Sequence, residues 1–123
     1  MKTAAPFIVV DNCKEKLKFY QSVLGGEIRV LRTQDERVLN AELDFGSSKI
    51  FIADTTAAKP TRKGDYAKVA LKSETEEEFL RAYEGLAEGG QTVAAPYEAP
   101  FNGKLAILSD RNGIGWVLQF YRD

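Results

Sequence analysis

The side chains that could do chemistry in this chain are carboxylates, basic groups and one thiol, because its 123 residues include no histidine. Histidine is the commonest metal ligand and the usual acid–base residue near neutral pH. Glu42 and Asp44 stand two residues apart, and more carboxylates lie at expected strand ends or loops: Asp54, Asp65, Glu98 and Asp110. Such oxygen ligands would suit Mg²⁺, Mn²⁺ or Ca²⁺.

A solvent-exposed, non-catalytic role for these carboxylates is the stronger interpretation. Side chains at positions i and i+2 of a strand share one face, and such a polar face is more often solvated. We therefore expect Glu42 and Asp44 to face water. Asp110 is expected to cap its own turn with Asn112 and Gly113.

Basic side chains offer an anion site as an alternative. Arg29 and Arg32 lie on one expected strand, with Arg62, Lys63 and Lys68 nearby in sequence or symmetry. Charge-assisted hydrogen bonds from these groups could hold a carboxylate or a phosphate. Isolated basic residues on strands are usually solvated, so both interpretations stay open.

Several aromatic residues could wall a pocket for a small molecule: Tyr66, Tyr97, Phe101, Trp116 and Tyr121. Ordinary core packing is the alternative, and for Trp116 the two are evenly matched. Tyr97 and Phe101 lie in a segment bounded by prolines, which favours a place at a pocket rim.

The single cysteine, Cys13, falls in the first turn of an expected helix. The helix dipole there could lower its pKa. No histidine is present to activate it, however, so we expect a buried, inert thiol.

The helices and strands that position these groups are predicted from the periodicity of apolar residues, and their ends from the positions of glycine. A helix opening at Asn12, with Glu15 as the partner in a capping box, ends at Gly25-Gly26. A second helix follows the capping box of Ser73 and Glu76 and ends at Gly89-Gly90. Expected strands cover residues 5–10, 27–33, 39–45, 49–53, 67–72, 91–96, 104–108 and 115–121. The expected loops are residues 54–65, which could form a flap, and 97–102, since Pro96 and Pro100 do not fit a central strand.

The chain also repeats itself. Residues 19–30 have an echo in residues 82–93, and each copy follows a short apolar strand. Matching elements are roughly 60 residues apart, so each half is one strand–helix–strands unit. Several strands are apolar on both faces, among them Phe7-Ile8-Val9-Val10 and Ile50-Phe51-Ile52. One face must pack on a helix, and the other must be covered by the facing sheet, a second subunit or an apolar ligand.

Bulk composition excludes several classes of function. The length fits one domain, and a net charge of -1 attracts neither nucleic acid nor an anionic membrane. No apolar run is long enough to span a membrane, and no secretion signal is visible. A lone cysteine fits a reducing compartment, so we expect a cytoplasmic protein.

The order of these motifs resembles the vicinal oxygen chelate superfamily, also called glyoxalase/bleomycin resistance/dioxygenase. The resemblance spans the whole chain and begins with Phe19-Tyr20 followed by Leu24-Gly25-Gly26-Glu27. The later segments look most like its PhnB-like branch: Gly89-Gly90, Pro96, Phe101-Asn102-Gly103 and residues 110–116. It implies an α+β fold of two βαβββ modules, about 1–54 and 66–123, forming a curved mixed sheet around a cleft, and a homodimer.

The resemblance also implies where a metal would bind, and there the chain departs from the family pattern. Metal enzymes of the superfamily take one His or Glu from each of four strands. The corresponding positions here are Ala4 or Ala5, one of residues 51–53, Ala67, and about Val117. Ile114 stands where the PhnB-like turn carries histidine. We therefore expect no metal and no cofactor.

The function expected from this resemblance is binding of a small organic molecule in the cleft between the modules. The expected ligand contacts are Arg29, Glu42, Tyr97, Phe101, Trp116, Gln119 and Tyr121. One alternative is a glyoxalase-like lyase or isomerase, in which Glu42 is the weak candidate for a catalytic base. Another is a structural dimer whose cleft is filled by its own side chains.

Overall fold

The computed structural model describes residues 1–56, 64 and 67–122. The chain divides into two compact units, Met1–Arg62 and Lys63–Asp123. Most of the expected joining loop, with the candidates Arg62, Lys63, Asp65 and Tyr66, lies outside the described residues. No helix in the described part of the chain is both long and apolar enough to cross a membrane.

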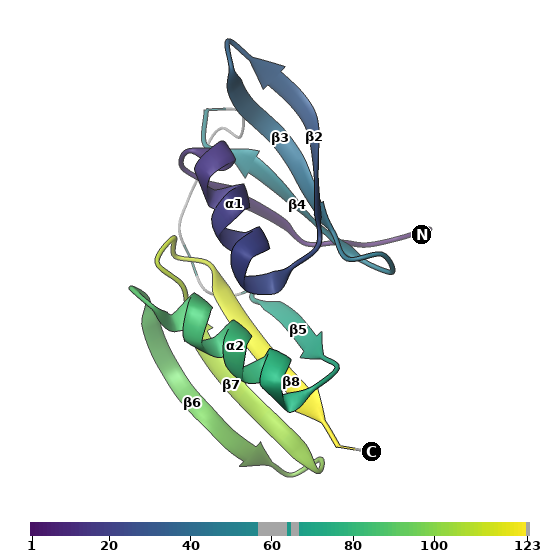
Figure 1. The fold of residues 1–123 in the computed structure, drawn as a ribbon, viewed down its shortest axis with the longest axis vertical. Coiled ribbons are helices and arrows are strands. Elements are labelled where there is room, and N and C mark those ends of the chain that lie inside the picture. The colour runs from purple at the N-terminus through teal and green to yellow at the C-terminus, as the bar shows by residue number, and fades with distance from the viewer. Residues whose placement is uncertain (57–63, 65–66, 123) are drawn as a thin grey trace. The chain divides into compact units, whose positions relative to one another are not determined.

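The first unit is a mixed four-stranded sheet with one helix on it (Figure 1). Its order along the chain is β1 (Phe7–Val10), α1 (Cys13–Leu24), β2 (Glu27–Gln34), β3 (Arg37–Asp44) and β4 (Lys49–Asp54). In space the order is β1-β4-β3-β2, with β1 parallel to β4 and the other neighbours antiparallel.

The second unit repeats this arrangement. It contains β5 (Val69–Ser73), α2 (Glu76–Ala87), β6 (Gln91–Ala99), β7 (Gly103–Ser109) and β8 (Gly115–Tyr121). Its sheet runs β5-β8-β7-β6, again with one parallel pair, β5 and β8. The expected α+β fold of two βαβββ modules is confirmed.

Even an irregularity of the sheet is repeated. In the first unit Val30 pairs with Ala41 and Arg32 with Asn40, which leaves Leu31 as an extra, bulged residue. In the second unit the pairs are Thr92 with Leu108 and Ala94 with Ile107, and the extra residue is Val93. Both edge strands are thus bulged, but the bulge at Val93 lies two residues nearer the paired strand end Gln91–Ser109 than the bulge at Leu31 lies to Glu27–Asp44.

Each helix is held by packing on its own sheet. An isolated helix of 12 residues is marginal in water, so buried contacts must supply the stability. Buried helix residues are Cys13, Leu17 and Tyr20 in α1, and Phe79, Ala82 and Leu86 in α2. The buried strand residues include Ile8, Val10, Ala41, Leu43, Ile50 and Ile52 in the first sheet and Val69, Ala106, Leu108, Trp116 and Leu118 in the second. Each large side chain contributes roughly 1.5–3 kcal/mol on burial.

The start of α1 corrects the sequence prediction. Asn12 has a left-handed backbone, with φ 54°, and its side chain makes no capping bond to the helix backbone. Its amide instead donates to Glu15 Oε2 at 2.8 Å. The N–H of Cys13 is capped by Asp54 Oδ1 at 2.9 Å. The cap is thus supplied by β4, 41 residues away, where a local motif cannot reveal it.

The start of α2 is also two residues later than expected. Thr75 is the N-cap and accepts from Glu78 N at 3.1 Å, while Glu78 Oε1 accepts from Glu74 N at 3.0 Å. The capping residues are therefore Thr75 and Glu78 rather than Ser73 and Glu76. Ser73 is unavailable because it still belongs to β5.

Strand β6 is longer than expected, because it continues through Pro96 and Tyr97 to Ala99. It is the edge strand of its sheet, and its register with β7 is irregular between Ala94 and Tyr97. Proline is tolerated at edges and bulges, where no ladder hydrogen bond is lost. Tyr97 therefore belongs to the sheet and not to a loop.

Candidate functional site

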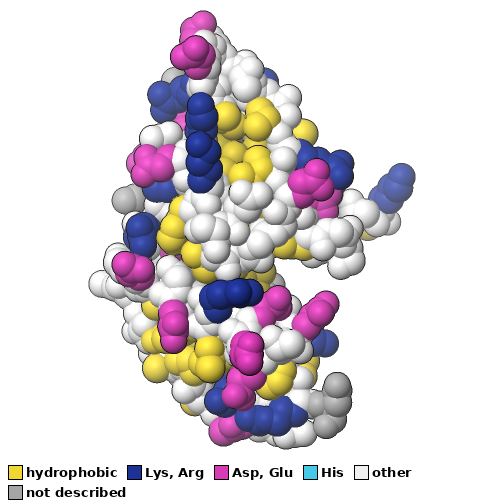
Figure 2. All heavy atoms as spheres, in the orientation of Figure 1, with side chains coloured by type: hydrophobic (Ala, Val, Ile, Leu, Met, Phe, Trp, Pro, Cys, Tyr) yellow, Lys and Arg dark blue, Asp and Glu magenta, His cyan; other side chains and the backbone are white. Residues whose placement is uncertain are grey.

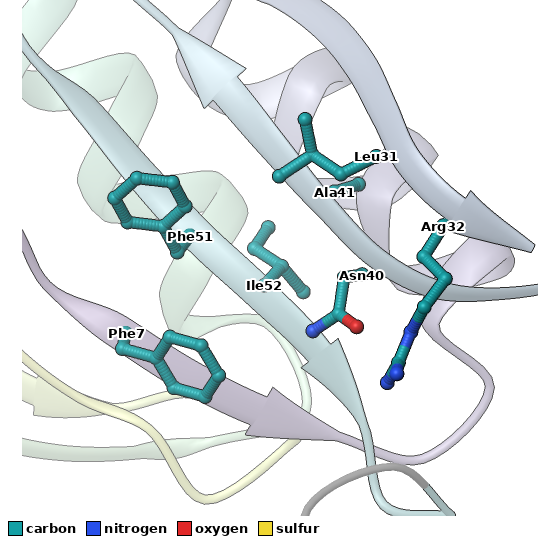
Figure 3. A pocket seen from close by; sticks show the side chains of 7 residues that line it. All are labelled: Phe7, Leu31, Arg32, Asn40, Ala41, Phe51 and Ile52. Carbon is teal, nitrogen blue, oxygen red and sulfur yellow. The ribbon is translucent and has the colours of Figure 1, made fainter.

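A hollow of about 350 Å³ lies on the first sheet. It is lined by residues of all four strands: Phe7, Leu31, Arg32, Asn40, Ala41, Phe51 and Ile52 (Figure 3). This volume falls at the lower end of the range for small-molecule pockets, about 300–1,000 Å³. It is the candidate site of this unit.

The apolar side of the hollow is formed by two phenylalanines on neighbouring strands. Phe7 of β1 is the Cα partner of Phe51 of β4, so both rings lie on the same face, and Figure 3 shows both labelled. The adjacent residues Ile8, Ile50 and Ile52 are buried in the core, whereas Phe7 is 59% exposed. The two rings therefore belong to the face turned away from α1, which we call the helix-free face.

The polar side of the hollow depends on the bulge at Leu31. Directly paired residues of antiparallel strands share a face. Arg29 pairs with Glu42, and Arg32 pairs with Asn40 two residues farther along β3. Arg29 and Arg32 thus share the helix-free face although they are three residues apart, which a regular strand of period two would forbid. The bulge re-aims Arg32 toward the hollow.

Two other basic side chains on this face lie beside carboxylates. Arg29 Nη2 lies 3.6 Å from Asp44 Oδ2, and Lys49 Nζ lies 3.4 Å from Glu42 Oε2. Arg32, by contrast, has no ion pair or hydrogen bond among the residues that the structure describes. Among the described residues, a positive charge without a counter-charge thus lies beside the hollow.

The environment of Glu42 differs from the sequence prediction. This residue is 6% exposed, so the expected solvated face of Glu42 and Asp44 is wrong for Glu42. Its carboxylate lies against Lys49, whose ammonium also lies 5.9 Å from the centre of the Phe51 ring. The neighbouring strands shield the Glu42 carboxylate from water, and Lys49 balances its charge.

The second unit brings together four of the predicted ligand contacts. Tyr97, Leu105 and Gln119 are successive cross-strand partners on β6, β7 and β8. The Tyr121 hydroxyl donates to Gln119 Oε1 at 2.7 Å, and the Phe101 and Tyr121 rings meet edge-on with centroids 4.6 Å apart. Lys72 Nζ lies 4.7 Å from the centre of the Tyr121 ring. Arg29 and Glu42 belong to the first unit.

Trp116 has a core position instead of a pocket position. It is fully buried, and its indole N–H donates to Asp110 Oδ2 at 2.8 Å. The predicted ligand contact by Trp116 is therefore corrected, because the side chain presents no surface. Asp110 Oδ1 accepts from the N–H groups of Asn112 and Ile114, which confirms the predicted cap of this turn.

Comparison with known proteins places this architecture in a family. The family model of the Glyoxalase/Bleomycin resistance protein/Dioxygenase superfamily matches residues 3–118. The chain belongs to this superfamily. The family expected from the sequence is thereby confirmed, although comparison with curated proteins gives no match.

Solved structures share the fold of this superfamily member at low sequence identity. Protein PA1353 from Pseudomonas aeruginosa is 21% identical over 100% of both chains, with a TM-score of 0.85. A putative 3-demethylubiquinone-9 3-methyltransferase, PhnB protein, from Bacillus cereus is 20% identical over 97% of this chain and 99% of that chain, with a TM-score of 0.76. A glyoxalase/bleomycin resistance protein/dioxygenase family enzyme from Burkholderia phytofirmans PsJN is 20% identical over 94% and 95%, with a TM-score of 0.76.

The described residues of this superfamily member provide few grouped ligands for a metal ion. No group of three or more His, Cys, Asp or Glu residues is placed there to hold an ion. Asp54 accepts hydrogen bonds from Cys13 N, Arg37 Nε and the Thr56 N–H and hydroxyl groups. Its oxygens are thus engaged in holding the unit together.

Sequence reasoning missed Phe7, Phe51 and Asn40 as site residues of this superfamily member. Strands apolar on both faces were a usable signal, because Phe7 and Phe51 occupy the face that the helix does not cover. Asn40 lies on the same strand face as Glu42 and Asp44, for which the sequence predicted only solvent. Arg32 was considered for anion binding, but the bulge that turns it toward the hollow has no sequence signature.

Proposed function

We propose that this superfamily member binds a small organic molecule in the hollow of the first sheet. The observation that carries the proposal is the pairing of Phe7 and Phe51 around a hollow of about 350 Å³. Apolar walls with a few convergent polar groups are typical of small-molecule sites. Arg32 and Asn40 supply the polar groups here.

The internal repeat provides a matched test of the proposal. Leu31 lines the hollow, whereas Val93 is the bulged residue of the second unit, and both are exposed. Small aromatic compounds are screened by thermal shift, since a ligand that prefers the native state raises Tm. For compounds that bind, Leu31→Ala is expected to weaken affinity about 10-fold through lost apolar contact, and Val93→Ala to leave it unchanged.

Two results would contradict binding at this site. The first is that both substitutions change affinity equally, which would put the ligand elsewhere. The second is that no compound binds while Leu31→Asp converts a dimer to a monomer in light scattering. That outcome would favour the structural dimer, with this face as its interface.

A lyase or isomerase activity is a second candidate, favoured by the burial of Glu42. A general base is a positioned side chain that takes a proton from a reacting group, and the Glu42 carboxylate is held 3.4 Å from Lys49 Nζ. Glu42 is the cross-strand partner of Phe51, so it adjoins the hollow. Turnover of a bound compound that is lost in Glu42→Gln, with binding kept, would support catalysis. Binding without turnover would leave the protein a binder.

A further inference from the structure

The charge on the helix-free face of the first sheet sets the kind of ligand that the hollow can accept. Arg29 Nη2 forms an ion pair with Asp44 Oδ2 at 3.6 Å, and Lys49 Nζ forms one with Glu42 Oε2 at 3.4 Å. Arg32 lines the hollow and has no such match within the described residues. A neutral or cationic ligand would leave this guanidinium uncompensated, whereas an anion would pair with it.

The fold does not need an arginine at this position. The matching positions of the two sheets follow by counting along β3 and β7 from the end pairs Glu27–Asp44 and Gln91–Ser109. On this count Asn40 corresponds to Leu105, and Arg32, the partner of Asn40, corresponds to Tyr97, the partner of Leu105. The two polar groups of the hollow are therefore absent from the sister sheet, which has the same strand order. The fold alone does not explain them.

We infer that the hollow selects a small monocarboxylate with a flat apolar body, an inference that rests on the proposed function. The Arg32 guanidinium can donate two parallel hydrogen bonds to a carboxylate, and the Asn40 amide adds a neutral donor. One cation matches one negative charge, which favours a carboxylate over a phosphate dianion. The apolar body then lies against Phe7 and Phe51.

Strand spacing sets the approximate length of this ligand. Asn40 and Phe51 lie on adjacent strands, and Asn40 pairs with Ala53, two residues from Phe51. Their backbones are therefore about 5 Å apart across the sheet and about 7 Å along it. A ring separated from the carboxylate by two or three bonds fits this diagonal, as in 3-phenylpropanoate.

The test compares 3-phenylpropanoate with its neutral isostere, 3-phenylpropanamide, by titration calorimetry on the full chain. We expect the carboxylate to bind at least about 10-fold more tightly, as a charge-assisted hydrogen bond predicts. Arg32→Ala should remove this preference and leave the affinity for the amide unchanged. Arg32→Lys should restore part of it, because an ammonium lacks the bidentate fork.

Arg29→Ala is the matched control, because Arg29 shares the strand and the face but is paired with Asp44. It should keep the preference for the carboxylate. Equal binding of carboxylate and amide by the wild-type protein would overturn the inference, as would loss of the preference in Arg29→Ala as complete as in Arg32→Ala. Tighter binding of phenyl phosphate than of 3-phenylpropanoate would overturn the choice of a monocarboxylate.

The outcomes also separate this inference from the proposed function. If the amide binds and Leu31→Ala weakens it, but the carboxylate has no advantage, the hollow is a binding site without selectivity for anions. If neither compound nor the neutral probe naphthalene binds, both the inference and the proposed function fail.

Discussion

The carboxylate of Asp54, at the end of β4, accepts a hydrogen bond from the backbone N–H of Cys13, the first residue of α1, at 2.9 Å. The same carboxylate accepts from Arg37 Nε of β3 at 3.0 Å and from the Thr56 hydroxyl at 2.5 Å. The Asp54 side chain is fully buried. One carboxylate thus ties the helix to two strands of the first sheet.

Replacing Asp54 by Ala should destabilise the protein by about 3 kcal/mol. The substitution removes the cap of α1 and so leaves the buried N–H of Cys13 without its acceptor, which costs about 1–3 kcal/mol. It also removes the hydrogen bonds that Asp54 accepts from Arg37 and Thr56. Urea unfolding followed by circular dichroism measures the difference. Glu27→Ala, an exposed carboxylate on β2, should change stability by less than about 0.5 kcal/mol, and an equal loss in both variants would contradict this account.

Acid should lower the folding stability of the protein by protonating Asp54. Burial by itself raises the pKa of Asp54, but hydrogen bonds from the Thr56 side chain, from Cys13 and Thr56 N–H groups and from Arg37 outweigh it, and the pKa falls from 3.8 to about 2. A carboxylate whose folded pKa is lowered contributes stability above its unfolded pKa. This contribution is lost as the pH falls from about 4 to about 2.

The loss over this window should be about 2 kcal/mol, since one pKa unit corresponds to about 1.4 kcal/mol. It is measured as the difference in unfolding free energy between wild type and Asp54→Asn at each pH. That difference should shrink as the pH falls through the window. A constant difference from pH 5 to about pH 2 would show that Asp54 is not the group responsible.

The thiol of Cys13 should be unreactive in the native protein. Burial raises its pKa, and the negative charge of Asp54 raises it further, to about 11. The thiolate, which is the reactive form, is therefore scarce at pH 8. We expect a disulfide reagent to label Cys13 slowly at pH 8 and at once in denaturant. Rapid labelling of the folded protein would contradict the burial of this thiol, which is 1% exposed.

The elements of this fold could be predicted from the sequence because their signals are local. Apolar alternation placed β3, and Gly25-Gly26 and Gly89-Gly90 placed the ends of both helices. The repeat predicted two equivalent units, and the structure confirms this in the order of the elements and of the strands in each sheet. Local periodicity and turn chemistry were sufficient for these features.

Features that depend on long-range pairing could not be predicted. The cap on Cys13 comes from Asp54, and no local pattern links two residues 41 positions apart. The face of Arg32 depends on an unpaired residue in β2, and a bulge changes the sheet's register without changing composition. Glu42 looked solvated because alternation identifies a face but not what covers that face. The candidate site consists mostly of such residues.

Replacing Trp116 by Phe should cost about 2–3 kcal/mol. The indole N–H donates to Asp110 Oδ2 at 2.8 Å, and the side chain is fully buried on β8. Phenylalanine removes the donor, which costs about 1–3 kcal/mol at a buried site, and leaves part of the indole volume empty. Circular dichroism is the appropriate probe, because Trp116 is the only tryptophan and its fluorescence disappears with it.

The matched control for Trp116→Phe is Tyr121→Phe on the same strand. Tyr121 is 38% exposed, so water can replace the hydrogen bond that its hydroxyl makes to Gln119. We expect a change below about 1 kcal/mol in this variant. The wild-type emission of Trp116 should shift to the red on unfolding, as the indole leaves the core for water. If the native protein already emits at the wavelength of a water-exposed indole, the Trp116 side chain lies at the surface. Trp116 would then again be a candidate ligand contact.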